Sequence, residues 1–108
     1  MYNFGSIPFF ASNNNLVEKN PSGIPSCTLL PSLSGLPSPE VTMRVNLGTW
    51  TNNPTGYNYN WYVNDILVSE GSTYEISSRE IGMYIKCIIT ASNSNGRSSA
   101  STISLLII

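Results

Sequence analysis

The chain has 108 residues, which is enough for one domain, and 41% of them are hydrophobic, which permits a modest core. Only 10% are charged and the formal net charge is −1, so the sequence lacks the basic surface that binds nucleic acid or anionic membranes. The 17 Ser and 13 Asn residues carry most of the polarity. Because both residue types favour turns over helix interiors, this composition favours an all-β fold.

The sequence also bears on the compartment in which the chain folds. Met1 is followed by neither a basic segment nor a long apolar stretch, so no secretory signal is expected. No span approaches the roughly 18 apolar residues of a membrane helix. The two cysteines, Cys27 and Cys87, are too few for a disulfide scaffold, and a single bridge between them is the alternative to two free thiols. We expect folding in a cytosol, with both thiols free and Cys87 acting as a small core residue.

Residues 1–27 differ from the rest of the chain. They combine large apolar side chains with three successive Asn residues, and six of the seven prolines lie before residue 40. The segment can be a disordered terminus, or an extended arm that becomes ordered by packing on a partner subunit or on its own domain. Disordered tails usually lack aromatic residues, so we favour an arm that binds a partner. Its candidate contact residues are Tyr2, Phe4, Ile7, Phe9 and Phe10.

From Thr28 onward, turn signals recur about every ten residues. Residues 28–36 predict a short edge segment, because Pro31 cannot donate a hydrogen bond to a central ladder. Residues 41–47 alternate apolar with polar side chains, which predicts a half-buried strand. Residues 48–56 predict a loop. The elements expected after it are strands over residues 57–64, 66–68 and 73–76, one helical turn over 77–80, a corner and central strand over 80–91, and a last strand over 100–108.

The central strand is rich in β-branched residues and is followed by Asn95-Gly96, a strong hairpin signal. Its inward residues Ile85, Cys87 and Ile89 are expected to face Trp61 across the core. The predicted core residues are Trp61, Tyr74, Ile85, Cys87 and Ile89.

About seven short strands separated by turns are typical of an immunoglobulin-like sandwich. Five motifs follow in order: Gly48-x-Trp50, Tyr59-x-Trp61, Ser72-Thr73-Tyr74, Glu80-x-Gly82 and Thr90-Ala91-x-Asn93-x-x-Gly96. In these motifs the chain resembles the immunoglobulin-like modules of bacteria and their phages, which are found on tailed-phage capsids, tails and fibres and in arrays on bacterial surface proteins. Glu80 stands where Asp is commoner in that pattern. We expect an extended N-terminal arm over residues 1–27 and an immunoglobulin-like β-sandwich over residues 28–108.

Catalysis is not expected. The chain has no histidine, so the Ser-His-Asp and Cys-His arrangements are absent. Asp65 is the only aspartate and no Cys-x-x-Cys spacing occurs, which argues against calcium and zinc sites. We expect no cofactor, and Glu70 and Glu75 as solvated charges rather than a carboxylate pair. Trp50, beside a loop rich in Asn, is expected to be structural, with weak glycan binding as the alternative. Tyr84 is a candidate for the corner hydrogen bond of sandwiches.

The last strand ends in two Leu and two Ile residues, apolar on both faces, with no charge to protect an edge. We expect another subunit or the arm to cover it through Leu106 and Ile108. With the resemblance, these features lead us to expect a tailed-phage structural protein: a capsid decoration (cement) protein on the virion, made in the bacterial cytoplasm. Its partners would be the major capsid protein or other virion subunits, in many copies. The alternatives are a tail, baseplate or fibre component, and a carbohydrate-binding surface module.

Overall fold

The structure is a computed structural model that describes residues 23–108. The candidate contact residues of the arm, from Tyr2 to Phe10, lie outside the described residues. The strands in chain order are β1 (Cys27–Leu29), β2 (Ser32–Ser34), β3 (Thr42–Asn46), β4 (Thr49–Trp50), β5 (Gly56–Val63), β6 (Ile66–Glu70), β7 (Thr73–Glu75), β8 (Tyr84–Asn93), β9 (Gly96–Ser101) and β10 (Leu105–Leu106). One 3₁₀ turn, η1 (Ser78–Glu80), lies between β7 and β8.

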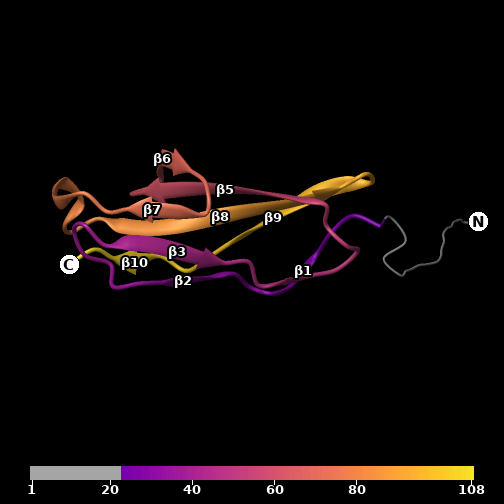
Figure 1. The fold of residues 1–108 in the computed structure, drawn as a ribbon, viewed down its shortest axis with the longest axis horizontal. Helices are drawn as coiled ribbons and strands as arrows, with labels where there is room; N and C mark the ends of the chain where they lie inside the picture. Colours follow the sequence, from indigo (N-terminus) through magenta and orange to yellow (C-terminus); the bar gives the residue numbers. More distant parts are fainter. Residues whose placement is uncertain (1–22) are drawn as a thin grey trace, which may run out of the picture.

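The strands form two main antiparallel sheets that enclose one core (Figure 1). In the first sheet β6 pairs with β5, β5 pairs with β8, and both β9 and β10 pair with β8. The second sheet has the order β2-β3-β7, and β1 pairs with β4 in a small separate ladder. The prediction of an all-β sandwich is therefore confirmed. The strand order corresponds to the A-B-E and G-F-C-C′ sheets of an immunoglobulin-like domain.

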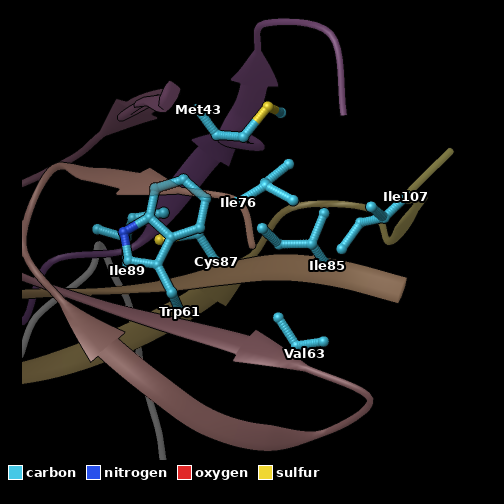
Figure 2. Close-up of a cluster of buried hydrophobic side chains, with 8 residues drawn as sticks. All are labelled: Met43, Trp61, Val63, Ile76, Ile85, Cys87, Ile89 and Ile107. Atoms are coloured by element: carbon cyan, nitrogen blue, oxygen red, sulfur yellow. The ribbon is translucent and has the colours of Figure 1, made fainter. Parts of the chain in front are cut away.

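The core lies where residues of both sheets meet (Figure 2). Its fully enclosed members are Met43, Trp61, Val63, Ile76, Ile85, Cys87, Ile89 and Ile107. Four of the five predicted core residues belong to it. The fifth, Tyr74, is only partly buried, and its ring stacks on Trp61 with the centroids 5.9 Å apart. The expectation that Trp61 faces the inward residues of β8 across the core was wrong, because β5 and β8 are neighbours in one sheet and Trp61 lies opposite Cys87 in their register. The strict alternation of buried and less buried residues along β8 explains why the core residues of this strand could be predicted.

The chain crosses between ladders near its start. The predicted edge segment over 28–36 is two strands, because β1 pairs with β4 while β2 pairs with β3. The predicted loop over 48–56 contains β4, so that prediction was incomplete. Gly48 has φ +77°, and a Cβ there would lie 2.1 Å from the carbonyl oxygen of Leu29. Only glycine lets the two backbone segments approach this closely.

The corner before β8 is built by η1, in agreement with the predicted turn of helix. Ser77 caps it in a capping box with Glu80. The hydroxyl of Tyr74 donates to Oε2 of Glu80 at 2.6 Å. The prediction for Tyr84 was wrong: its side chain is exposed and makes no hydrogen bond within residues 23–108, so Tyr74 supplies the phenol that braces the corner.

Candidate interaction surfaces

The last strand is apolar on both faces, as the sequence indicated, and the two faces have different environments. Leu105 and Ile107 point into the core, whereas Leu106 and Ile108 keep 45% and 59% of their surface exposed. Leu106 lies opposite Tyr84 in the β10–β8 register, so the two share the outer face of the sheet. Within the described part of the chain nothing covers Leu106 and Ile108, and their role in partner binding stays a prediction.

Other exposed apolar residues gather around this strand end. The amide of Ile108 donates to the carbonyl oxygen of Pro37, and the amide of Gly82 donates to that of Ile107. Leu36 precedes Pro37 in the sequence, and Ile81 precedes Gly82. These bonds therefore bring the exposed side chains of Leu36 and Ile81 to the same end of the sandwich. We call the resulting set the C-terminal apolar surface; it consists of Leu36, Ile81, Tyr84, Leu106 and Ile108.

The root of the predicted arm is fixed at the opposite end of the sandwich (Figure 1). The side-chain amide of Asn93 donates to the carbonyl oxygens of Gly23, at 2.7 Å, and Asn52, at 2.8 Å. The side-chain amide of Asn52 donates in turn to the carbonyl oxygen of Ile24 at 2.8 Å. Pro25 is buried, and the hydroxyl of Ser98 donates to its carbonyl oxygen. Residues 23–26, which the sequence assigned to the arm, therefore pack on the β8–β9 hairpin.

The outer face of the larger sheet carries a polar hollow of about 420 Å³. Thr90 and Ser99 share a hydrogen bond of 2.7 Å inside it. The side-chain amides of Asn58 and Asn60 have no hydrogen-bond partner among the described residues. The hollow is lined by Asn58, Asn60, Glu70, Thr90, Arg97, Ser98 and Ser99, which we call the polar groove.

A second hollow of about 310 Å³ lies beside Lys86 on the same sheet. The ammonium group of Lys86 lies 3.1 Å from a carboxylate oxygen of Asp65 and 6.0 Å from the ring centroid of Tyr62. The two charges of this hollow therefore neutralise each other, so it offers a ligand fewer unpartnered polar groups than the polar groove does.

The two carboxylates considered for a catalytic pair are divided between the sheets. Glu70 ends β6 and faces the polar groove, while Glu75 lies on β7 opposite Thr42. Among residues 23–108, no group of three His, Cys, Asp or Glu side chains is placed to hold a metal ion. The same residues contain no helix long and apolar enough to cross a membrane.

Both cysteines are free in the structure. The Cys27 thiol donates to the carbonyl oxygen of Leu29 at 3.2 Å. Burial raises the pKa of the Cys87 thiol to about 12, with a smaller opposing effect from a backbone hydrogen bond to Asn60. A thiol with so high a pKa is not a nucleophile at neutral pH, so Cys87 serves the core.

Trp50 is held in a structural position. Its indole N–H donates to the carbonyl oxygen of Leu47 at 2.8 Å, and its ring meets Tyr57 edge-on at 6.5 Å. Both residues pack against the core from its margin. Trp50 is thus held by the core, which supports its predicted structural role, and the glycan hypothesis is considered below for the polar groove.

No family model, curated protein or solved structure matches this chain. Its function is therefore inferred from the chemistry of its own surfaces. Sequence reasoning named Leu106 and Ile108, which the structure shows to be exposed and whose binding role stays a prediction, but it missed Asn52 and Asn93 as anchors of residues 23–26. An Asn beside a hairpin turn is common, and nothing local shows that its amide bonds a segment about 70 residues away.

Proposed function

We propose that this chain is a non-enzymatic structural component of a tailed-phage particle, namely a capsid decoration protein present in many copies on the virion. Its partners are the major capsid protein or other virion subunits, and it is made in the bacterial cytoplasm. The observation that carries the proposal is the C-terminal apolar surface, whose side chains lie exposed at one end of a compact sandwich. Clustered apolar residues of this kind mark interaction sites on soluble domains.

The size of this surface explains why a second attachment point is needed. Burying the exposed half of five apolar side chains contributes about 1 kcal/mol each, or roughly 5 kcal/mol in all. That gain is close to the affinity of a millimolar complex before the entropy cost of association is subtracted. The surface alone binds weakly, so stable attachment requires the arm, with its five large apolar residues, and many copies on one particle.

The test removes residues 1–22 only, because residues 23–26 pack on the sandwich and β1 begins at Cys27. The truncated protein should stay folded and should no longer sediment with particles that lack the native protein. A matched variant keeps the arm at full length and changes Tyr2, Phe4, Ile7, Phe9 and Phe10 to Ser; it should fail in the same way. Undiminished binding of both proteins would refute attachment by the arm.

A tail, baseplate or fibre location is the same proposal with a different partner. Immunodetection in separately purified heads and tails distinguishes the two locations. A signal confined to tails would reject the decoration role and keep the structural one.

A second candidate function, carbohydrate binding, is favoured by the polar groove. Its two unpartnered Asn amides and its hydroxyl pair match the donors and acceptors of a neutral sugar. Glycan binding should be lost in the Asn58→Ala/Asn60→Ala double variant and retained in Trp50→Phe. A glycan array that is negative for the full chain would remove this candidate.

A further inference from the structure

The turn between β8 and β9 contains the one Asn-Gly sequence of the chain. Asn93 pairs with Gly96 at the end of the hairpin, so Ser94 and Asn95 form the turn itself. Asn95 is exposed, and among residues 23–108 its side-chain amide forms no hydrogen bond. Asn is a heat-labile residue type, and a following glycine leaves no side chain between that amide and the next peptide nitrogen. Hairpin tips with small polar residues are also the places where a fold opens most readily.

The neighbouring Asn93 has a different environment, although it belongs to the same hairpin. It is half-buried, and its side-chain amide donates to the carbonyl oxygens of Gly23 and Asn52. Its Oδ1 accepts a hydrogen bond from the backbone amide of Asn95 at 2.8 Å. Three hydrogen bonds therefore hold the carboxamide of Asn93, and it cannot turn towards the peptide nitrogen of Ser94 without breaking them. The carboxamide of Asn95 has no such restraint.

The same turn holds the root of the predicted arm. A Cβ added to Gly23 would lie 2.6 Å from Nδ2 of Asn95, so the turn packs directly on the backbone of Gly23. A Cβ added to Gly96 would lie 2.9 Å from Cγ1 of Ile24, so the Ile24 side chain lies against the backbone of the turn. Contacts this close require the turn to keep its length and position. A change in the backbone at position 95 would therefore act directly on residues 23–26.

We propose that Asn95 is a site of spontaneous deamidation, and that the isoaspartate formed there detaches residues 23–26 from the β8–β9 hairpin. The peptide nitrogen of Gly96 attacks Cγ of Asn95, the new N–Cγ bond closes a succinimide ring, and the Cγ–Nδ2 bond breaks. Nδ2 leaves as ammonia with the proton of the peptide nitrogen. Water then opens the ring at either carbonyl carbon, which gives aspartate or isoaspartate. In sum, an amide and water become a carboxylate and ammonium, and no oxidant or reductant takes part.

Isoaspartate lengthens the turn. The chain then runs through Cβ and Cγ of residue 95, which adds one backbone atom between the paired residues Asn93 and Gly96. The longer turn cannot keep this pair and also keep residue 95 packed on Gly23 and Gly96 packed on Ile24. Residues 23–26 therefore lose their seat on the hairpin. The inference concerns the chain's own covalent chemistry and does not depend on the proposed attachment to a particle.

Peptide mapping of the full chain tests the modification. Trypsin cleaves after Lys86 and Arg97, so one peptide of residues 87–97 carries both Asn residues of the hairpin. After incubation at pH 8, tandem mass spectrometry should show an amide converted to an acid at Asn95, at least tenfold more often than at Asn93. The same peptide, incubated alone, sets the time that the reaction needs without the fold. An Asn95 that stays intact in the folded chain while the free peptide is fully converted, or equal conversion at both positions, overturns the proposal.

Hydrogen exchange tests the structural consequence. The backbone amide of Ser26 donates to the hydroxyl of Thr51 at 3.0 Å, so it reports whether residues 23–26 stay packed. Its exchange should accelerate at least tenfold in the isoaspartate form, isolated by ion exchange through its added charge. Freshly made Asn95→Asp carries that charge without the added backbone atom and should exchange at the wild-type rate, and Asn95→Ser should not change on incubation. Unchanged exchange in the isoaspartate form, or equal acceleration in Asn95→Asp, overturns the proposal.

Discussion

Gly48 decides the path of the chain between the sheets. Its φ is +77°, and the backbone of Leu29 and Leu30 passes where a side chain would begin. Gly48→Ala should destabilise the fold by about 3 kcal/mol or more, because the new Cβ meets backbone that cannot move without breaking the β1–β4 ladder. The unfolding midpoint in urea measures the loss.

Gly71→Ala is the matched control for this prediction. Gly71 also has a positive φ, +117°, but nothing lies within 4 Å of its added Cβ. Its substitution should cost only the backbone strain, about 1 kcal/mol. Equal losses for the two variants would mean that strain, and not the crossing of β1 over Gly48, explains the glycine in the Gly-x-Trp motif.

Tyr74 should make the stability depend on alkaline pH. Burial, followed by the hydrogen bond to Glu80 and the repulsion of its charge, raises the pKa of Tyr74 from 10.0 to about 12. The folded state therefore favours the protonated phenol. Its contribution is fully present below about pH 10 and is lost as the pH rises through 12.

Tyr74→Phe tests this dependence. At pH 8 the variant should be less stable than the wild type by about 1 kcal/mol, the net value of the lost hydrogen bond. The difference should shrink between pH 10 and 12, because only the wild type carries the phenol. The raised pKa of Cys87 acts in both proteins and cancels in the comparison. A constant difference over this range, in urea titrations, would exclude the assigned role of the phenol.

At the scale of the element, the last strand is interrupted by Thr102. The sequence predicted one strand over residues 100–108, and the structure has β9 and β10 with a break between them. The buried hydroxyl of Thr102 accepts a hydrogen bond from the amide of Cys87 at 3.0 Å and so replaces a ladder bond at the break. Ladder pairing with β8 resumes at Leu105.

Thr102→Val should therefore cost about 1–3 kcal/mol, because the amide of Cys87 would be buried without an acceptor. Thr102→Ser keeps the hydroxyl and loses only a methyl group. Amide exchange at Cys87 should accelerate at least tenfold in the Val variant and much less in the Ser variant. Similar exchange rates in both would show that the methyl group, and not the hydroxyl, stabilises the break.

Other strands show what the sequence could and could not predict. Alternation along β3, β5 and β8 fixed their inward faces, because each strand has one face in a core. The division of residues 27–34 between two ladders depends on partners distant in sequence, and no local pattern encodes it. The exposed apolar run of β6 was visible in the sequence. The register shift that leaves Val68 without a partner on β5 was not, because it depends on how the two strands pair.

At the scale of the whole molecule, the two proposed attachment points lie at opposite ends of the sandwich (Figure 1). Asn93 fixes the root of the arm at one end of β8, and Tyr84 belongs to the C-terminal apolar surface at the other. The ten residues of β8 separate them by about 30 Å. A chain held at both ends can bridge two neighbouring subunits of a particle, whereas one held by adjacent surfaces cannot.

Bridging predicts that the two ends contribute independently to particle binding. Phe10→Ala in the arm and Leu106→Lys at the other end should each weaken binding. The double variant should weaken it by the product of the two factors, to within about twofold, because distant sites that share no partner residues are additive. Thr49→Lys, on the exposed residue of β4, controls for the added charge. Co-sedimentation over a range of protein concentrations measures the affinities of the wild type, the two single variants, the double variant and the control. If the double variant binds the particle with the same affinity as the single variant that binds more weakly, both ends act on the same contact and bridging is excluded.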